Sequence, residues 1–351
     1  MQTHQLCPSS LPDAVALLNP WQRNFPLVRE PYAVVAKQWG RSSAEVLTLL
    51  KALSSGGALS RIGGVFSAHA GGAALLSAMA VPPERLQEVA AIVSAHPGVN
   101  HNYEREDRFN LWFVMTAFDR ALLEQAMLGL ERDTGLAALR LPMVRPYRID
   151  LGFDLRARVA GAPLQQSDQH FAPVVAEEDR ALAALLEEGL PLVEQPFDVW
   201  AKALGCELES VLVKLQAWLD VGTLRRFGTI VRHHEFGFDA NAMTVFNVPA
   251  DQVDARGARV AREAGVTLSY RRQPAPGWPY NLYFMVHGTD RAAVEATIAR
   301  VIDNCGLDDF AHQVLFSRQR FKQTGARRFR ELPTDWSAAG PVLDKASYAV
   351  A

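Results

Sequence analysis

The apolar and polar positions of the chain repeat one succession of helical and strand patterns twice. At the start of each half, apolar residues recur at helical spacing in three short segments. These segments are residues 14–18, 31–40 and 42–54 in the first half and residues 179–188, 196–205 and 208–219 in the second. A glycine-containing turn and a short apolar run follow in each half, and together they predict a winged helix-turn-helix.

The ends of the predicted helices carry recognisable signals. Pro31 and Pro196 suit the first turn of a helix, because proline has no backbone N–H to lose there. Gly40 and Gly205 are suited to end the same helices. Ser42 or Ser43 is a candidate N-cap for the third helix of the first half.

After each helix-turn-helix, the patterns follow the order strand, helix, strand, strand, helix, strand. They cover residues 73–81, 83–95, 98–105, 109–117, 120–132 and 138–149 in the first half, and 241–248, 251–264, 266–272, 280–287, 291–303 and 312–321 in the second. This order is typical of a ferredoxin-like α/β sandwich. The predicted fold class is therefore α+β, a tandem duplication of a winged helix-turn-helix plus a ferredoxin-like sandwich.

The duplication can be followed residue by residue. A shift of 165 positions places Phe25 on Leu190, Arg61 on Arg226 and His69 on His234 without a gap. We expect the following divisions: residues 12–62 and 177–226 as helix-turn-helix units, 63–153 and 227–330 as sandwiches, 154–176 as a linker and 331–351 as a tail.

Composition and charge disfavour several classes of function and site. The net charge is -2, and the predicted third helices carry as many acidic as basic residues or more, so both disfavour a protein that holds DNA by a cationic face. Cys7, Cys206 and Cys305 are too far apart to suggest a disulfide framework or a metal site. The chain shows no secretory leader and no apolar run of membrane-spanning length, so we expect a cytoplasmic protein that does not enter the membrane.

Two strands of the first sandwich are unusually rich in polar residues. Strand alternation places His101, Tyr103 and Arg105 on one face. The second copy keeps the tyrosine and the arginine, but it has Leu268 where the first copy has His101.

Four stretches carry a family resemblance: SRIGGVF, HNYEREDRFNLWF, RRFGTIVRHHEFGFDANAM and YRRQPAPGWPYNLY. They resemble the sirohaem decarboxylases, in a fused form in which two homologous subunits are joined, and the resemblance covers roughly residues 12–330. It implies an Lrp/AsnC-like fold and the removal of carbon dioxide from two acetate side chains of sirohaem, which gives 12,18-didecarboxysirohaem. That reaction serves the biosynthesis of the haem of denitrifying nitrite reductase and needs no redox cofactor. The family pattern leads us to expect a histidine at position 268, and Leu268 departs from it.

The resemblance and the chemistry of the substrate together select candidate site residues. Sirohaem carries eight carboxylates, for which arginine offers a bidentate partner, and protonation of a new methyl group calls for an acid. The candidate catalytic residues are His101, Tyr103, His234 and Tyr270. The candidate substrate-binding residues are Arg61, Arg105, Asn110, Trp112, Arg226, Arg232, His233, Arg271, Arg272, Tyr280, Asn281 and Tyr283. The protein alone is expected to bind no metal, although His233 or His234 is a candidate axial ligand for the substrate iron.

Several alternatives remain open. The same architecture serves transcription regulators of the Lrp/AsnC kind, here one that senses haem or a small metabolite, and a tetrapyrrole carrier would bind without turnover. Asn110 and Asn281 are as well suited to hold a strand pair as to contact a ligand, and Trp112 and Tyr283 suit a hydrophobic core. The expected partners are a tetrapyrrole, with haem considered as a second ligand, and further copies of the chain or homologous decarboxylase subunits, but not DNA.

Overall fold

The computed structural model describes residues 11–157, 159–160 and 172–330. Each half begins with three α-helices and then one strand. In the first half these are α1 (Leu11–Leu18), α2 (Pro31–Trp39), α3 (Ser43–Ser55) and β1 (Leu59–Phe66), with the short helix η1 (Asn19–Gln22) after α1. In the second half they are η3 (Glu177–Asp179), α6 (Arg180–Glu188), α7 (Pro196–Leu204), α8 (Leu208–Asp220) and β7 (Leu224–Val231).

The predicted helix signals are confirmed. Gly40 and Gly205 lie in the left-handed region just after α2 and α7, where a side chain would be strained. The Ser42 side chain accepts from the backbone N–H of Glu45, and the Glu45 carboxylate accepts from the backbone N–H of Ser42. This capping box satisfies two backbone donors at the start of α3.

The strands β1 and β7 pair with each other, one from each half. They are antiparallel over their whole length, and Gly63 lies directly opposite Gly228. These two glycines also match each other in the duplicated sequence, so a pseudo-two-fold axis passes between them. The strands expected as wings therefore join the halves instead of forming a hairpin within each half. The helices of both helix-turn-helix units bury one common hydrophobic core around this strand pair.

Each half continues with the elements of a sandwich. In the first half these are β2 (Ala73–Met79), η2 (Pro83–Arg85), α4 (Leu86–Ala95), β3 (Val99–Arg105), β4 (Leu111–Ala117), α5 (Arg120–Thr134), β5 (Ala138–Leu141) and β6 (Met143–Ile149). In the second half they are η4 (His233–Phe236), β8 (Ala240–Phe246), α9 (Val253–Val260), β9 (Val266–Arg272), β10 (Leu282–Gly288), α10 (Arg291–Cys305) and β11 (His312–Gln323).

The last strand of each sandwich crosses into the other half. Residues 312–316 of β11 pair with β8 of their own half, whereas residues 317–323 pair with β3 of the first half. In the same way β5 pairs with β2, and β6 pairs with β9 of the second half. The prediction of one strand over residues 138–149 is therefore corrected. The strand is interrupted at Pro142, which lacks the N–H that a ladder requires, and it changes partners there.

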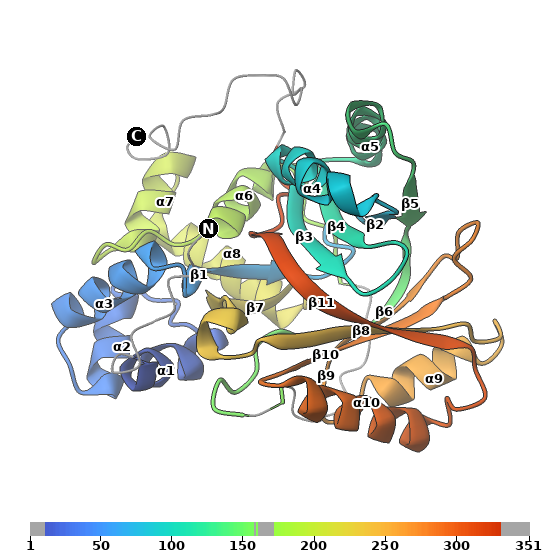
Figure 1. Ribbon diagram of the computed structural model, residues 1–351. Helices are drawn as coiled ribbons and strands as arrows, with labels where there is room; N and C mark the ends of the chain where they lie inside the picture. Colours follow the sequence, from blue (N-terminus) through green and yellow to red (C-terminus); the bar gives the residue numbers. More distant parts are fainter. Residues whose placement is uncertain (1–10, 158, 161–171, 331–351) are drawn as a thin grey trace.

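This exchange bends the main sheet round on itself. The strand order is β5-β2-β4-β3-β11-β8-β10-β9-β6, and its two ends, β5 and β6, are consecutive in the chain. No ladder joins β5 to β6 among the described residues, so the sheet is an open barrel with an inner and an outer face. Figure 1 shows α4 and α5 on one side of the strands, α9 and α10 on the opposite side, and the helix-turn-helix helices grouped around β1 and β7.

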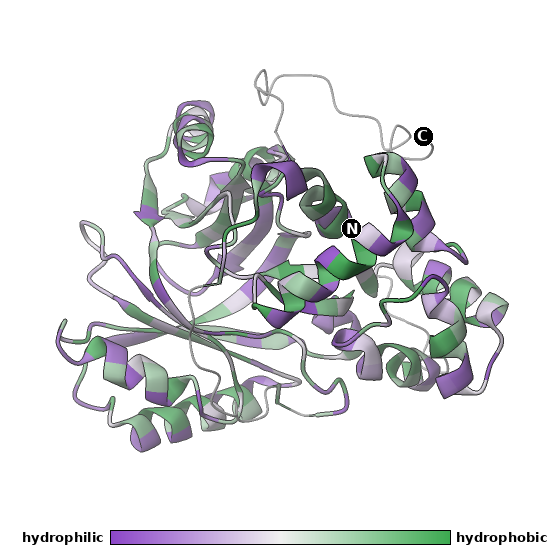
Figure 2. Ribbon diagram, turned by 180° about the vertical axis from the view of Figure 1, so that it is seen from behind, coloured by the Kyte–Doolittle hydropathy of each residue, from purple (hydrophilic) through white to green (hydrophobic). Residues whose placement is uncertain are grey.

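Three separate hydrophobic cores follow from this arrangement. One lies beneath α4 and α5, and a second lies beneath α9 and α10, where the helices turn their apolar residues to the strands. The third fills the inside of the barrel and is rich in aromatic residues. Hydrophilic and hydrophobic positions alternate around the outer helices in Figure 2, as expected for helices that cover one face of a sheet.

The expected boundaries at 62/63 and 226/227 fall inside β1 and β7. The expected linker, residues 154–176, packs its described ends into the core of the helix-turn-helix units through Leu155, Ala160 and Val175. The rest of that linker, residue 158 and residues 161–171, and the expected tail, residues 331–351, lie outside the described residues. None of the described helices combines the length and the apolar character needed to cross a bilayer.

Candidate active site

Two polar regions lie where the barrel meets the β1–β7 pair, one for each half. We call them the first junction, comprising Arg61, Asn100, His101, Tyr103, Thr116 and Arg320, and the second junction, comprising Arg226, His233, Thr267, Leu268, Tyr270 and His287. Arg61 lies close enough to His101, and Arg226 to His233, for each arginine to lower the pKa of its histidine.

Arg61 and Arg226 occupy matching positions on β1 and β7. The Arg61 guanidinium donates to the carbonyl of Gly64 at 3.3 Å, and that of Arg226 donates to the matching carbonyl of Thr229 at 3.4 Å and to that of Gln22 at 2.8 Å. Burial lowers the pKa of each to about 10, so both remain charged at neutral pH. Neither forms an ion pair within 4 Å of a described carboxylate, although the charge of Glu187 acts on Arg61 and that of Asp150 on Arg226 from further away. Each junction thus contains a cation, half-buried for Arg61 and buried for Arg226, that an anionic ligand could neutralise.

His101 faces the inside of the first junction. Its Nδ1 lies 2.9 Å from the side-chain oxygen of Asn100, whose amide nitrogen donates to the Thr116 hydroxyl at 3.1 Å. Because the Asn100 oxygen can only accept, Nδ1 of His101 carries the hydrogen and Nε2 keeps its lone pair. Burial, followed by the charge of Arg61, lowers the pKa of His101 to about 4. The imidazole is therefore neutral at pH 7 unless a negative charge arrives beside it.

Tyr103 lies two residues further along β3, and its ring stacks on that of His101 with 6.3 Å between the ring centroids. Burial raises the pKa of Tyr103, and Arg105 and Arg320 oppose this rise. Arg320 is paired with Glu235 at 3.0 Å, and Arg232 donates to the carbonyl of Gly57 at 2.5 Å. Both arginines of this neighbourhood are thus already engaged, although Arg232 forms no ion pair within 4 Å among the described residues.

The second junction has a different set of imidazoles. His233 stacks on Phe153 with 4.1 Å between ring centroids, and its Nε2 donates to the carbonyl of Leu151 at 3.0 Å. Burial lowers its pKa to about 3. Only Nδ1 of His233 therefore remains for a bond to iron. The His287 ring lies 6.3 Å from both the Phe153 and the His233 rings.

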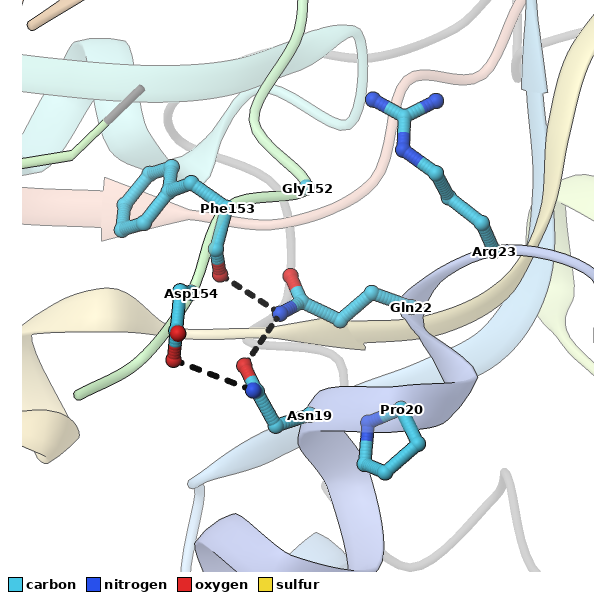
Figure 3. Close-up of a pocket in the computed structure, with 7 residues that line it drawn as sticks. All are labelled: Asn19, Pro20, Gln22, Arg23, Gly152, Phe153 and Asp154. Carbon is cyan, nitrogen blue, oxygen red and sulfur yellow. Dashed lines mark hydrogen bonds between the residues drawn. The ribbon is translucent and has the colours of Figure 1, made fainter. Parts of the chain in front are cut away.

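A cavity of about 180 Å³ opens beside the second junction. Figure 3 shows its lining, with Asn19 and Gln22 on one wall and Phe153 and Asp154 on the other. The side-chain amide of Gln22 donates to the carbonyl of Phe153 at 2.7 Å and to the Asn19 side chain at 3.1 Å. The Phe153 ring, which lines the cavity, also stacks on His233, so the cavity lies next to this junction.

Arg105 and Arg272 hold the exchanged strands in place. Arg105 donates to the carbonyl of Leu315 at 2.9 Å, and Arg272 donates to the matching carbonyl of Leu141 at 2.6 Å. Both side chains are buried, and each lies over a tyrosine ring, Arg105 at 5.7 Å and Arg272 at 4.5 Å. The two arginines predicted to bind substrate thus have a structural task at the points where the strands cross.

The side chains of other predicted binding residues already make their hydrogen bonds within the protein itself. The Asn110 side chain exchanges two hydrogen bonds with the backbone of Val81, both at 2.9 Å, and Asn281 does the same with Val248 at 2.7 and 3.0 Å. Trp112 donates to the carbonyl of Phe109 at 2.5 Å. Of the predicted site residues, Trp112, Tyr270 and Tyr283 are buried in the barrel core, and Tyr280 packs against it.

Two predicted residues lie away from both junctions. Arg271 points to the opposite face of β9 from Arg272, where it lies 3.4 Å from Asp254 and lines a separate cavity of about 380 Å³. His234 pairs with Asp239 at 2.8 Å and is partly exposed. Within residues 11–157, 159–160 and 172–330, no three histidine, cysteine or acidic side chains come together as metal ligands.

The sequence reasoning did not select His287, Asn100 or Thr116. A usable signal existed for His287, because Tyr283, Met285 and His287 alternate onto the inner face of β10. Asn100 and Thr116 matter only through their contact with each other and with His101. That contact joins two strands, so no local pattern could reveal it.

Comparisons with known proteins place this arrangement in a class. A family described as an AsnC-like ligand binding domain matches residues 70–148 and 235–322. A second family, described as a Siroheme decarboxylase NirDL-like HTH domain, matches residues 15–59 and 179–225. The fold is therefore a duplicated helix-turn-helix and AsnC-like ligand-binding domain, as the sequence predicted.

Whole-chain relatives make the class specific. The Siroheme decarboxylase NirDL subunit of Paracoccus denitrificans is 39% identical over 311 residues, which cover 88% of this chain and 95% of the relative. The NirD subunit of Pseudomonas aeruginosa is 50% identical over 141 residues, 40% of this chain and 94% of that subunit. The crystal structure of NirDL in complex with an iron-uroporphyrin III analogue superposes with a TM-score of 0.62 at 28% identity, over 91% of this chain and 95% of that one. This chain belongs to the sirohaem decarboxylase family.

Proposed function

We propose that the chain removes carbon dioxide from two acetate side chains of sirohaem and releases 12,18-didecarboxysirohaem, as a carboxy-lyase without a redox cofactor. At each acetate the bond between the methylene carbon and the carboxylate breaks, and its electron pair stays on the methylene carbon. One proton then completes a methyl group. The reaction needs no external electrons.

The observation that carries this proposal is the pair of arginines Arg61, half-buried, and Arg226, buried, neither of which forms an ion pair within 4 Å among the described residues; Glu187 and Asp150 act on them only from further away. An arginine charge in a low-dielectric site costs free energy unless an anion approaches it. A tetrapyrrole with eight carboxylates supplies such anions on two sides of one ring. Arg232, close to the first junction and likewise without an ion pair within 4 Å among the described residues, adds a third binding group.

His101 has the properties of the acid at the first junction. Its Nε2 is free of hydrogen bonds within the described residues, and its low pKa reflects burial and the nearby Arg61. A bound carboxylate offsets both causes and raises the pKa of His101, so the imidazole acquires a proton together with the substrate. Tyr103 stacks beside it as a second donor, and burial, which raises the pKa of Tyr103, keeps that hydroxyl protonated. Tyr270 takes the place of Tyr103 in the second junction.

The first test is anaerobic incubation of the purified chain with sirohaem, followed by mass analysis of the extracted tetrapyrrole. We expect the loss of two carbon dioxide molecules. His101→Gln should retain tetrapyrrole binding and slow turnover by about 100-fold or more, because a glutamine cannot transfer a proton. The matched control is His312→Gln. His312 is exposed and lies at the start of β11, the end of that strand away from His101, so this variant should turn over sirohaem as the wild-type chain does.

Two outcomes would contradict the proposal. Sirohaem that binds and is recovered unchanged would identify a carrier or a sensor. Salt-dependent binding of a DNA duplex would favour the regulator. We propose that the chain does not bind DNA, since α3 and α8 offer few cationic side chains to phosphates, and that it associates with further copies or homologous subunits.

A further inference from the structure

The second junction contains an imidazole that replaces the one lost at position 268. In the first junction the imidazole comes from β3, as His101, and is linked through Asn100 to Thr116 on β4. In the second half the positions matching Asn100 and Thr116 are Thr267 and His287. The imidazole thus stands on the neighbouring strand, at the position where the first junction has Thr116.

The hydrogen bonds of His287 assign the tautomer of its neutral imidazole. The Thr267 hydroxyl donates its one hydrogen to the carbonyl of Met285 at 3.1 Å, and its oxygen lies 2.9 Å from Nδ1 of His287. That oxygen can therefore only accept from the imidazole, and Nδ1 carries the hydrogen. Nε2 keeps its lone pair and has no hydrogen-bond partner in the described part of the chain. This is the same tautomer as that of His101.

The surroundings of His287 match those of His101 in charge. Burial, followed by the charge of Arg105, lowers its pKa to about 4, the same value as for His101. His287 lies beside His233, and Arg226 is close enough to lower the pKa of His233. Each junction thus combines an arginine from the β1–β7 pair with a neutral imidazole whose Nε2 is available.

We propose that His287 is the proton donor for the second acetate, so that both junctions are catalytic and the substitution by Leu268 leaves the chain bifunctional. This inference rests on the proposed function. The second junction would bind a tetrapyrrole through its acetate carboxylate on Arg226. Binding of that carboxylate raises the pKa of His287, so Nε2 acquires a proton from solvent. Once the carboxylate departs as carbon dioxide, the electron pair left on the methylene carbon takes that proton from Nε2, and the imidazole returns to its neutral form.

The test compares the wild-type chain with His287→Gln by following the masses of the products during anaerobic incubation with sirohaem. We expect the wild-type chain to lose two carbon dioxide molecules. His287→Gln should accumulate the product that has lost one, with the second step at least about 100-fold slower. His101→Gln should also accumulate a singly decarboxylated product, but with the other acetate removed.

A rescue variant separates the acid role from a structural one. In His287→Gln/Leu268→His the imidazole returns to the β9 position that His101 occupies on β3. The second decarboxylation should recover at least tenfold, whereas a merely structural role of His287 predicts no recovery. Wild-type turnover by His287→Gln would overturn the inference while the proposed function stands, and so would the loss of a single carbon dioxide by the wild-type chain.

A separate measurement distinguishes failure of the proposed function from failure of this inference. If the wild-type chain leaves sirohaem unchanged, the imidazole nuclear magnetic resonance of His287 is followed while uroporphyrin, an octacarboxylate porphyrin, is added. A shift toward the imidazolium form would keep His287 as a ligand contact, although without the reaction. An unmoved resonance with bound porphyrin would overturn the site as well.

Discussion

At the scale of single residues, the two glycines at the pseudo-two-fold axis allow the halves to meet. A Cβ on Gly63 would lie 2.5 Å from the carbonyl oxygen of Leu186, and one on Gly228 would lie 2.6 Å from the carbonyl carbon of Gln22 and against the carbonyl of Trp21. All of these neighbours are backbone atoms, which cannot rotate away. Glycine is therefore required by close approach of the helix-turn-helix units.

Gly228→Ala should lower the free energy of unfolding by about 1–3 kcal/mol, because the added methyl group overpacks a backbone contact. The matched control is Gly129→Ala in α5, where the nearest atom to a Cβ is the flexible end of Arg132 at 3.6 Å. That variant should be unchanged or up to about 1 kcal/mol more stable. Urea unfolding measures both, and equal stabilities of the two variants would show that the crossing tolerates a side chain.

The residues of the site were only partly predictable. His101, Arg61 and Arg226 could be selected, because strand alternation and the internal repeat place them without knowledge of contacts. Asn281 could not be assigned between two roles, since its partner is the backbone of a loop that follows another strand. Strand alternation could have placed His287 on the inner face of β10, but its hydrogen bond with Thr267 joins two strands and has no local pattern.

At the scale of elements, the exchange of strands between the halves is the main feature that the sequence did not predict. A period-two pattern identifies a strand and its buried face, and those predictions were confirmed for nearly all strands. It does not identify the neighbouring strand, which depends on contacts far apart in the sequence. The sequence therefore predicted two complete sandwiches, whereas the structure completes each with a strand of the other.

Cutting the chain between its halves should leave them associated. A protease site introduced within residues 161–171 would separate the two halves covalently, but β1–β7, β3–β11 and β6–β9 would still join them. We expect the cleaved protein to elute as one species in size-exclusion chromatography and to separate only in denaturant. The uncut chain is the control, and two species under native conditions would contradict the role given to the exchange.

At the scale of the whole molecule, buried neutral histidines link stability to pH. The pKa values of His96, His101 and His287 are lowered to about 4 and that of His233 to about 3, in each case chiefly by burial. The unfolded chain protonates histidine near pH 6.5. Between these values the unfolded state binds more protons, so acidification favours unfolding.

The free energy of unfolding should therefore fall as the pH decreases from 6.5 toward 4.5, by at most about 1.4 kcal/mol per pH unit for each histidine. Burial raises the pKa of Glu187, which acts in the opposite sense, but this is one group against four. Urea unfolding at pH 7, 6 and 5 measures the effect, and replacement of His287 by glutamine should make the slope shallower. Constant or rising stability toward pH 5 would contradict it.

The pairing of β1 with β7 and the exchange of the last strands have a consequence for stoichiometry. Two free subunits that met through such surfaces could also form homodimers, since each half carries a matching copy of the surface. In one chain the partner is always present at high effective concentration. Every molecule therefore contains one of each half, and the asymmetry of His101 opposite Leu268 is preserved without any mechanism that selects the correct partner.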